Sequence, residues 1–238
     1  MISVVVPAHD EADNLGPLVR EIHAALKEFA HEIVIVDDGS TDGTAVALRE
    51  MQRADPQLRV LRHRLPCGQS AALRSGIRAA RHPWIATLDG DGQNDPADLP
   101  RLWSARPPGL RPDQPWLAIG HRLNRCDTGW RRFSSRFANG LRAWWLADAT
   151  PDTGCGTKLF GRAMYLDLPW FDHQHRYFPA LVRRAGGATV SVPVNHRPRA
   201  HGRTKYGTWG RAWAGVVDLW GVKWLQRRNR LPQAEEIA

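Results

Sequence analysis

Two aspartates separated by one glycine, Asp89 and Asp91, are the residues in this chain whose type and spacing most directly suggest chemistry. They follow the apolar run 84–88, which is typical of a buried strand. Open α/β sheets bind their ligands at the carboxyl ends of such strands. Two carboxylates suit Mg²⁺ or Mn²⁺ bridging substrate phosphates, and Gly90 would let the backbone come close to the bound group. A solvated acidic turn would have the same sequence.

Strand and helix patterns alternate along the N-terminal part of the chain. Continuous apolar runs predict strands, and apolar residues at helical spacing predict the helices between them. This alternation favours a parallel sheet with helices on both faces. The expected strands cover residues 2–6, 32–36, 59–62 and 84–88, and the expected helices include 15–29, 46–51 and 68–81.

Acidic residues follow three of these expected strands and would share one crevice if the strands are neighbours. Helix capping is the ordinary explanation for Asp42 and Asp95, but it does not explain the pair Asp37 and Asp38 before a glycine. The acidic residues at the three strand ends are Asp10, Glu11, Asp37, Asp38, Asp89 and Asp91.

Composition divides the 238 residues into two parts of opposite charge. The net charge is +9, but residues 1–120 carry −3 and residues 121–238 carry +12. The acidic part suits a metal ion, and the basic part suits nucleic acid, anionic lipid or a phosphorylated substrate. The length and the 42% hydrophobic residues fit one globular α/β domain. No run approaches the roughly 20 apolar residues of a membrane span, and three cysteines without metal spacing favour a reducing cytosol.

Six motifs resemble the family 2 glycosyltransferases, and more narrowly the polyprenyl-phosphate (dolichol-phosphate mannose synthase-like) transferases. Their co-occurrence in the family's order is far more specific than any one motif. The resemblance implies a GT-A-type, Rossmann-like nucleotide-sugar-binding domain over residues 1–208, with a mainly parallel central sheet. A C-terminal amphipathic helix and polar tail would follow over 209–238. The motifs are PAHDEADN, VDDGSTDGT, LDGDGQNDP, DTGCGTKLF, HRYFPALVRRAG and RAHGRTKYG.

The resemblance assigns the donor to the ends of the first strands. It implies that Asp89, Asp91 and Gln93 hold Mg²⁺ or Mn²⁺, which would neutralise the diphosphate as charge develops on the leaving nucleotide. His9 stands where the family has an aromatic or a small residue. The residues expected to bind the donor are Pro7, His9, Glu11, Asp37, Asp38, Asp89, Gly90 and Asp91.

The resemblance assigns the acceptor to the basic part of the chain. Arg122 matches an arginine near the substrate phosphates, and Asp152 matches an acidic position on the acceptor side; with Asp89 and Asp91 they form the expected catalytic set. Residues 199–205 resemble Arg-x-x-Gly-x-Ser-Lys, whose cations grip a lipid phosphate through charge-assisted hydrogen bonds. The expected acceptor-phosphate ligands are Arg199, Arg203, Thr204 and Lys205.

The implied reaction is the metal-dependent, inverting transfer of a sugar from a GDP- or UDP-linked donor to the phosphate of undecaprenyl or dolichyl phosphate. A phosphate monoester is largely dianionic at neutral pH, so it can attack the anomeric carbon without a strong general base. Two alternatives stay open. One is a family 2 glycosyltransferase with a soluble saccharide acceptor; the other is a nucleic-acid-binding protein, suggested by the positive charge and the aromatic–arginine stripes.

Two amphipathic stripes combine tryptophan with arginine. Core packing is the usual reason for an apolar stripe, but Trp beside Arg is typical of a helix in a membrane interface. We therefore expect a peripheral protein at the cytoplasmic face of the inner membrane, without a transmembrane helix and without a nucleic-acid partner. The C-terminal stripe is Trp209, Trp213, Val216, Val217, Trp220 and Trp224, followed by Arg227, Arg228 and Arg230; the central stripe is Trp130, Phe133, Phe137, Leu141, Trp144 and Trp145, flanked by Arg131, Arg132, Arg136 and Arg142.

Overall fold

A seven-stranded sheet forms the centre of the molecule. The computed structural model describes residues 1–122, 142, 145–148, 150–199 and 208–230, and over 208–214 it describes the helix without its side chains. The strands are β1 (Ile2–Ala8), β2 (His31–Asp37), β3 (Leu58–Arg62), β4 (Trp84–Thr87), β5 (Trp116–Arg122), β6 (Lys158–Gly161) and β7 (Ala188–Val194). Their order in the sheet is β3-β2-β1-β4-β6-β5-β7.

The first four strands are parallel, as the alternating pattern predicts. The chain winds outward from β1 to β3 and then returns to place β4 on the other side of β1. A reversal of this kind opens a crevice at the carboxyl ends of the two central strands. Beyond it, β6 runs antiparallel between β4 and β5, whereas β7 is parallel to β5. The sheet is therefore mainly parallel.

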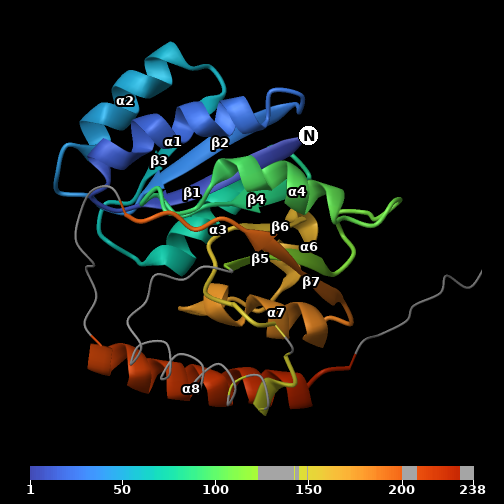
Figure 1. The fold of residues 1–238 in the computed structure, drawn as a ribbon. Coiled ribbons are helices and arrows are strands. Elements are labelled where there is room, and N and C mark those ends of the chain that lie inside the picture. The colour runs from blue at the N-terminus through green and yellow to red at the C-terminus, as the bar shows by residue number, and fades with distance from the viewer. Residues whose placement is uncertain (123–141, 143–144, 149, 200–207, 231–238) are drawn as a thin grey trace, which may run out of the picture.

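Helices cover both faces of the sheet (Figure 1). They are α1 (Ala12–Ala25), α2 (Thr44–Ala54), α3 (Gln69–Ala79), the 3₁₀ helix η1 (Pro96–Asp98), α4 (Leu99–Ser104), α6 (Arg162–Asp167), α7 (Gln174–Arg184) and α8 (Thr208–Arg227). One face is covered by α1, α2 and α4, and the other by α3, α6 and α7. Because helices shield both sides, β1 and β2 are almost completely buried, and each carries an unbroken apolar run, 4–6 in β1 and 33–36 in β2.

Two acidic side chains serve as helix caps, as expected. Asp42 Oδ1 accepts a hydrogen bond from the backbone N–H of Thr44 at 2.9 Å, at the start of α2. Asp95 Oδ1 accepts one from the backbone N–H of Ala97 at 3.0 Å, at the start of η1. The first N–H groups of a helix have no partner inside it, so these two carboxylates satisfy donors that would otherwise need water.

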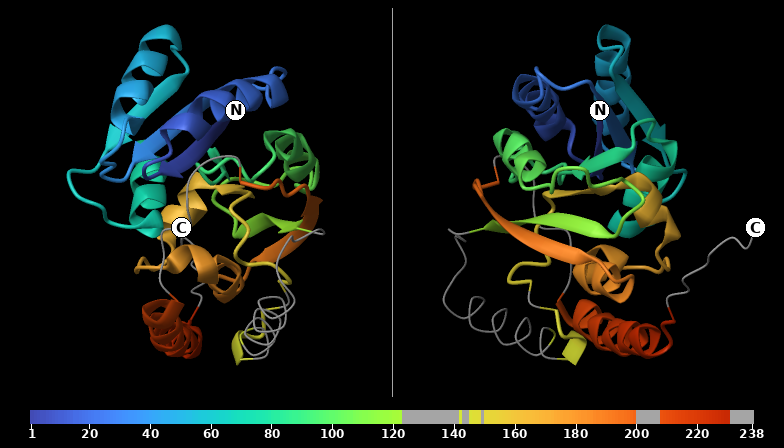
Figure 2. Two further views of the ribbon diagram at one scale, coloured as in Figure 1. Left: turned by 60° about the vertical axis from the view of Figure 1, so that its left-hand side comes forward. Right: turned by 90° about the vertical axis from the view of Figure 1, so that its right-hand side faces the viewer.

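One face of α8 packs on α7, which separates α8 from the sheet (Figure 2). Val222 is buried in this contact. The hydroxyl of Tyr177 donates to the carbonyl of Gly215 at 2.7 Å, and His173 Nδ1 lies 3.1 Å from Asp218 Oδ2. Asp218 and the backbone of Gly215, which lie off the tryptophan stripe, thus bind α8 to the domain. The proposed boundary between residues 208 and 209 stays a prediction.

The opposite face of α8 exposes large apolar side chains. Val216, Val217, Trp220 and Trp224 are 47%, 55%, 61% and 59% exposed, respectively. Core packing is therefore the wrong interpretation for these four members of the C-terminal stripe. The side chains of its other two members, Trp209 and Trp213, lie outside the described residues. Among the described residues, no helix is both long and apolar enough to cross a bilayer.

Most of the central stripe lies outside the described residues, but two of its positions do not. The ring of Trp145 packs edge-on against Trp220, with 5.2 Å between ring centroids. Arg142 is buried, contacts the carboxylate of Asp148 and donates to the carbonyl of Thr150 at 3.0 Å. The expectation that Arg142 flanks an exposed stripe is therefore wrong, because this guanidinium is consumed in neutralising a buried carboxylate.

Candidate active site

One edge of the sheet collects the predicted site residues. The parallel strands β1, β2, β4, β5 and β7 all end there, and antiparallel β6 begins there, since Thr87 at the end of β4 pairs with Lys158 at the start of β6. Segments as distant as Glu11 and Arg199, which are 188 positions apart, come into contact at this edge.

Asp89 is held from several sides. Its backbone N–H donates to Asn94 Oδ1 at 2.8 Å, and Gln69 Nε2 donates to its Oδ1 at 2.8 Å. Gly90 beside it packs so closely on β1 that a Cβ would lie 2.9 Å from the carbonyl oxygen of Pro7. The sequence predicted that Gly90 would let the backbone approach a bound group; in the structure it lets the backbone approach β1.

Asp91 faces the segment after β7 that ends at Arg199. Its Oδ1 accepts from the backbone N–H of Gln93 at 3.1 Å, and its Oδ2 lies 3.2 Å from Arg199 Nη2. The side-chain amide of Gln93 points elsewhere, with Nε2 donating to the carbonyl of Arg197 at 3.4 Å. The role of Gln93 as a metal ligand stays a prediction.

Electrostatics make the pair of aspartates a fitting cation site. Burial and the neighbouring charge of Asp91 together raise the pKa of Asp89 to about 6, against the opposing charge of Lys158. Two crowded carboxylates of this kind repel one another, and a divalent ion with oxygen preference would relieve the repulsion. The donor set therefore fits Mg²⁺ or Mn²⁺.

Arg122 and Asp152, predicted separately, are each other's partners. Arg122 Nε and Nη2 lie 2.7 and 2.8 Å from the two carboxylate oxygens of Asp152, a bidentate pair. Both side chains are largely shielded from water. The pairing fixes the guanidinium at the end of β5, where its charge also acts on Asp89. Since its carboxylate is already engaged by Arg122, Asp152 is better suited to positioning than to removing a proton.

Sequence reasoning missed two residues that contact or face Asp89. A Cβ on Gly156 would lie 2.2 Å from Asp89 Oδ2, so any larger residue there would push the carboxylate aside. Lys158 is buried, and its ammonium donates to the carbonyl of Cys155. Burial lowers the pKa of Lys158, and the negative charges of Asp89 and Asp152 oppose the change. A lysine opening an apolar strand was the one signal that could have drawn attention to this position.

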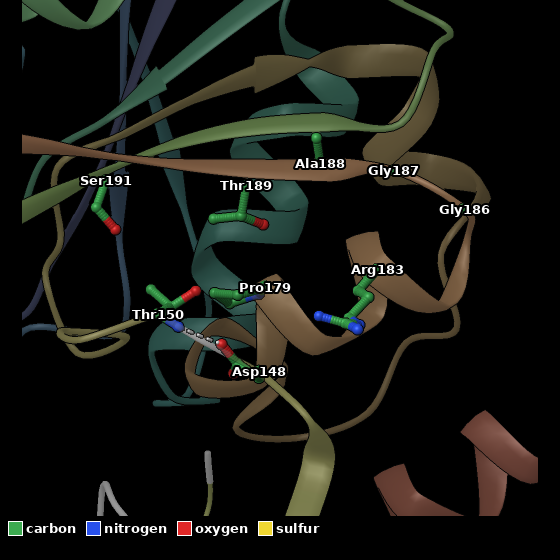
Figure 3. A pocket seen from close by; sticks show the side chains of 9 residues that line it. All are labelled: Asp148, Thr150, Pro179, Arg183, Gly186, Gly187, Ala188, Thr189 and Ser191. Atoms are coloured by element: carbon green, nitrogen blue, oxygen red, sulfur yellow. Dashed lines mark hydrogen bonds between the residues drawn. The ribbon is translucent and has the colours of Figure 1, made fainter. Parts of the chain in front are cut away.

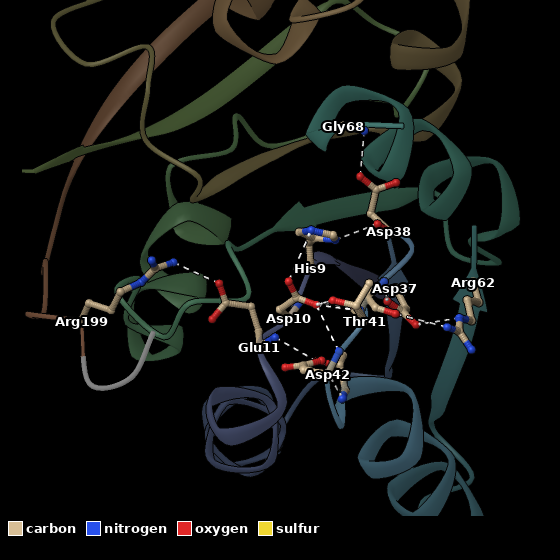
Figure 4. A network of polar contacts seen from close by, with 12 residues as sticks. His9, Asp10, Glu11, Asp37, Asp38, Thr41, Asp42, Arg62, Gly68 and Arg199 are labelled. Carbon is tan, nitrogen blue, oxygen red and sulfur yellow. Dashed lines mark hydrogen bonds and ion pairs between the residues drawn. The ribbon is translucent and has the colours of Figure 1, made fainter. Parts of the chain in front are cut away.

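The predicted donor residues at the ends of β1 and β2 form a polar network (Figure 4). Asp38 accepts three hydrogen bonds or ion contacts: His63 Nδ1 at 2.6 Å and the backbone N–H of Cys67 at 2.8 Å reach Oδ1, and the N–H of Gly68 at 2.7 Å reaches Oδ2. Its side chain thereby ties β2 to the start of α3. His63 and Cys67 were not expected at the site.

Neighbouring members of this network are engaged in the same way. Asp37 Oδ1 accepts from the backbone N–H of Ser40 at 2.9 Å, and its Oδ2 lies 3.2 Å from Arg62 Nε. His9 Nδ1 lies 2.9 Å from the carbonyl oxygen of Asp38. These side chains are held by one another and by nearby backbone at the ends of β1 and β2, and their roles toward a nucleotide stay predictions. Arg203, Thr204 and Lys205 lie outside the described residues.

Two cavities lie away from the aspartate pair. A cavity of about 400 Å³ between α7 and β7 includes Asp148, Thr150 and Arg183 in its lining, and contains none of the predicted site residues (Figure 3). A smaller one, of about 160 Å³, is lined partly by Gln69 and Ser70 at the start of α3 and by His175 of α7. Gln69 connects this second cavity to Asp89.

A mainly parallel sheet with a carboxylate pair beside its topological switch is the arrangement expected of a GT-A fold. Residues 3–106 match the glycosyl transferase family 2. The chain is 36% identical over 239 residues to the dodecaprenyl-phosphate galacturonate synthase of Rhizobium johnstonii, covering 97% of this chain and 69% of that protein. It is 32% identical over 210 residues to the undecaprenyl-phosphate 4-deoxy-4-formamido-L-arabinose transferase of Edwardsiella ictaluri, covering 87% of this chain and 63% of that protein. The chain belongs to glycosyl transferase family 2.

Solved structures confirm the predicted fold. The glucosyl-3-phosphoglycerate synthase of Mycobacterium tuberculosis, in complex with Mn²⁺, uridine diphosphate and phosphoglyceric acid, superposes with a TM-score of 0.67 at 18% identity, over 98% of this chain and 80% of that one. The same enzyme has also been solved with Mg²⁺ and uridine diphosphate. The predictions of a GT-A fold and of a family 2 glycosyltransferase are thus both confirmed.

Proposed function

We propose that this glycosyltransferase moves a sugar from a nucleotide-sugar donor to the phosphate of a polyprenyl phosphate, with inversion and with Mg²⁺ or Mn²⁺ at Asp89 and Asp91. One observation supports it most. Arg199, which leads into the basic loop expected to grip a lipid phosphate, contacts Asp91 of the expected metal site. The names of the two relatives, both polyprenyl-phosphate sugar transferases, agree with this acceptor.

In the proposed reaction the chain positions charges and removes no proton. A metal ion held by Asp89 and Asp91 would neutralise the donor diphosphate. Arg122, locked by Asp152, presents a fixed cation beside the same site. Lys158 compensates part of the charge of Asp89 from the buried side. The acceptor phosphate then attacks the anomeric carbon as a dianion, and the bond to the nucleotide breaks.

The exposed face of α8 is proposed to lie on the cytoplasmic surface of the membrane. Trp220 and Trp224 are amphipathic rings suited to an interface, and Arg228 lies 6.0 Å from the ring of Trp224. Arg227 and Arg230 follow on the same segment and suit anionic headgroups. A polyprenyl phosphate keeps its phosphate at headgroup level, so a docked face would bring the site to its acceptor.

The function is tested by offering undecaprenyl phosphate in vesicles, with Mn²⁺ and a panel of GDP- and UDP-linked sugars. We expect label from one donor to appear in a lipid-phosphate sugar, and none with undecaprenol, which lacks the phosphate. Transfer to a soluble saccharide with none to the lipid phosphate would contradict the proposal and support the soluble-acceptor alternative.

Membrane docking is tested separately by sedimentation with vesicles containing anionic lipid. The double substitution Trp220→Glu and Trp224→Glu should lower bound protein at least about tenfold, since each buried ring contributes on the order of a kilocalorie or more. Trp170→Glu is the matched control, because Trp170 is also exposed, at 43%, but belongs to the segment between α6 and α7 and contacts Arg74 of α3. Equal binding by the double variant and the wild type would overturn the docking surface.

A further inference from the structure

Arg199 is bound to two carboxylates of the expected donor site. Its Nη2 lies 3.0 Å from Glu11 Oε1 and 3.2 Å from Asp91 Oδ2. The side chains are 23%, 9% and 18% exposed, respectively, so water screens these pairs less than it screens pairs on an open surface. One guanidinium therefore joins the end of β1 to the aspartate pair after β4.

The segment carrying Arg199 is fastened to the aspartate loop just before this contact. Asn94 and His196 form an antiparallel bridge, and the backbone N–H of Arg197 donates to the carbonyl of Gln93 at 3.0 Å. Arg197 itself pairs with Glu21 at 2.6 Å and with Asp95 at 2.7 Å, away from Asp91. The reach of Arg199 to Asp91 is thus set by a backbone that is hydrogen-bonded to the aspartate segment.

The two expected duties of this region compete for the same groups. A divalent ion on Asp91 would need the carboxylate oxygen that the Arg199 guanidinium now neutralises. The ion and the guanidinium, both bound to one carboxylate, would repel one another. A lipid phosphate would in turn need the guanidinium that Glu11 and Asp91 now hold. Both conflicts disappear if Arg199 leaves the carboxylates when the metal ion arrives.

We propose that Arg199 is a latch that makes the enzyme load its donor first. Its ion pairs with Glu11 and Asp91 hold the guanidinium away from an acceptor until a metal–nucleotide complex displaces it, after which it binds the acceptor phosphate. Metal binding and acceptor binding are then coupled with positive sign, and the coupling is reciprocal. This inference rests on the proposed function, because it takes the acceptor to be a phosphate monoester.

Calorimetric titration of the full chain with Mn²⁺ alone, and with Mn²⁺ plus UDP or GDP, tests the latch. Arg199→Gln removes the competing cation and should bind Mn²⁺ about fivefold more tightly than the wild type, the scale of a partly shielded ion pair. Arg197→Gln is the matched control: it removes the same charge two residues away and should leave the Mn²⁺ affinity within about a factor of two. Unchanged or weaker Mn²⁺ binding by Arg199→Gln, or equal tightening in the control, would overturn the latch.

Farnesyl phosphate, a short soluble probe, tests the coupling. The wild type should bind it at least about fivefold more tightly after Mn²⁺ and nucleotide are added, whereas Arg199→Gln should bind it weakly in both conditions. Equal affinity of the wild type with and without Mn²⁺ would exclude ordered loading. The proposed function would fail in a different way. If the wild type showed both binding effects but transferred no sugar to undecaprenyl phosphate, the latch would stand and polyprenyl phosphate would not be the acceptor.

Discussion

The two acidic motifs at the carboxyl ends of the parallel strands differ in where their partners come from. The carboxylates of Asp37 and Asp38 find their partners within their own part of the chain, in segments close to β2 and β3. Asp89 and Asp91 have partners nearby in the sequence too, but they also meet the basic part of the chain, where Gly156 packs against Asp89 and Arg199 pairs with Asp91. We call the first motif the floor, because its partners all lie in the N-terminal part, and the second the seam, because it joins the acidic part to the basic part.

The largest effect should come from removing charge at the seam. Asp91→Asn keeps the shape of the side chain but weakens the metal site, so transfer should fall on the order of a thousandfold while the fold stays intact. Steady-state rates with saturating donor, together with circular dichroism, measure both quantities. Full activity of the variant in excess EDTA would show that the aspartate pair does not hold a metal ion.

Gly156→Ala should disturb the same contact region, because Gly156 packs against the Asp89 carboxylate. Its Cβ would lie 2.2 Å from Asp89 Oδ2, so the carboxylate must move, and we expect about a hundredfold loss of transfer from a displacement of this size. Gly221→Ala is the control, since a Cβ there meets nothing within 4 Å. Wild-type activity in Gly156→Ala would mean that Asp89 needs no fixed position.

The floor should respond in stability more than in chemistry. Asp38→Asn replaces an acceptor of three contacts by an amide with only one acceptor oxygen, which should lower the free energy of unfolding by about 1–3 kcal/mol. Asp91→Asn should lower it by less, because its carboxylate is engaged mainly by a displaceable guanidinium. Urea titration of the two variants measures the contrast, and equal losses would erase the distinction between floor and seam.

A further effect concerns pH. The pKa of Asp89 is raised from 3.8 to about 6, so between these values the folded protein binds more protons than the unfolded chain. The contribution of Asp89 to stability is therefore present below about pH 4 and is lost as the pH rises through about 6. In EDTA, the stability of the wild type relative to Asp89→Asn should fall across this window. A difference that is constant from pH 4 to 7 would contradict the raised pKa.

Much of the floor could be read from the sequence, and little of the seam could. The parallel strands, the caps at Asp42 and Asp95 and the carboxylates at strand ends follow from local patterns, because each depends on residues that are near one another in the chain. Gly156 against Asp89 is a contact between distant loops, and no local pattern contains it. The four-residue strand β6 is too short to show a period, so its direction was not predicted.

The errors have the same origin. Arg142 was expected beside the central stripe from its helical spacing, but its environment is set by Asp148, six positions on, and by the carbonyl of Thr150. Arg122 and Asp152 were each singled out, yet their pairing depends on how β5 and the segment before β6 approach each other. Spacing reports which face a side chain occupies, and it does not report what lies opposite.

The position of β6 also has a consequence for how the enzyme is made. Strands β1 to β4 can pair once the first 90 or so residues exist, because all four lie within that stretch. β6 joins β4 through Thr87 and Lys158, about 70 positions apart, so this pairing waits until Lys158 has been made. Gly156 and Lys158 arrive with that strand. A chain still emerging from the ribosome thus has the aspartates that follow β2 and β4 before Gly156 and Lys158 can approach Asp89, and the proposed metal site takes its native geometry only late in folding.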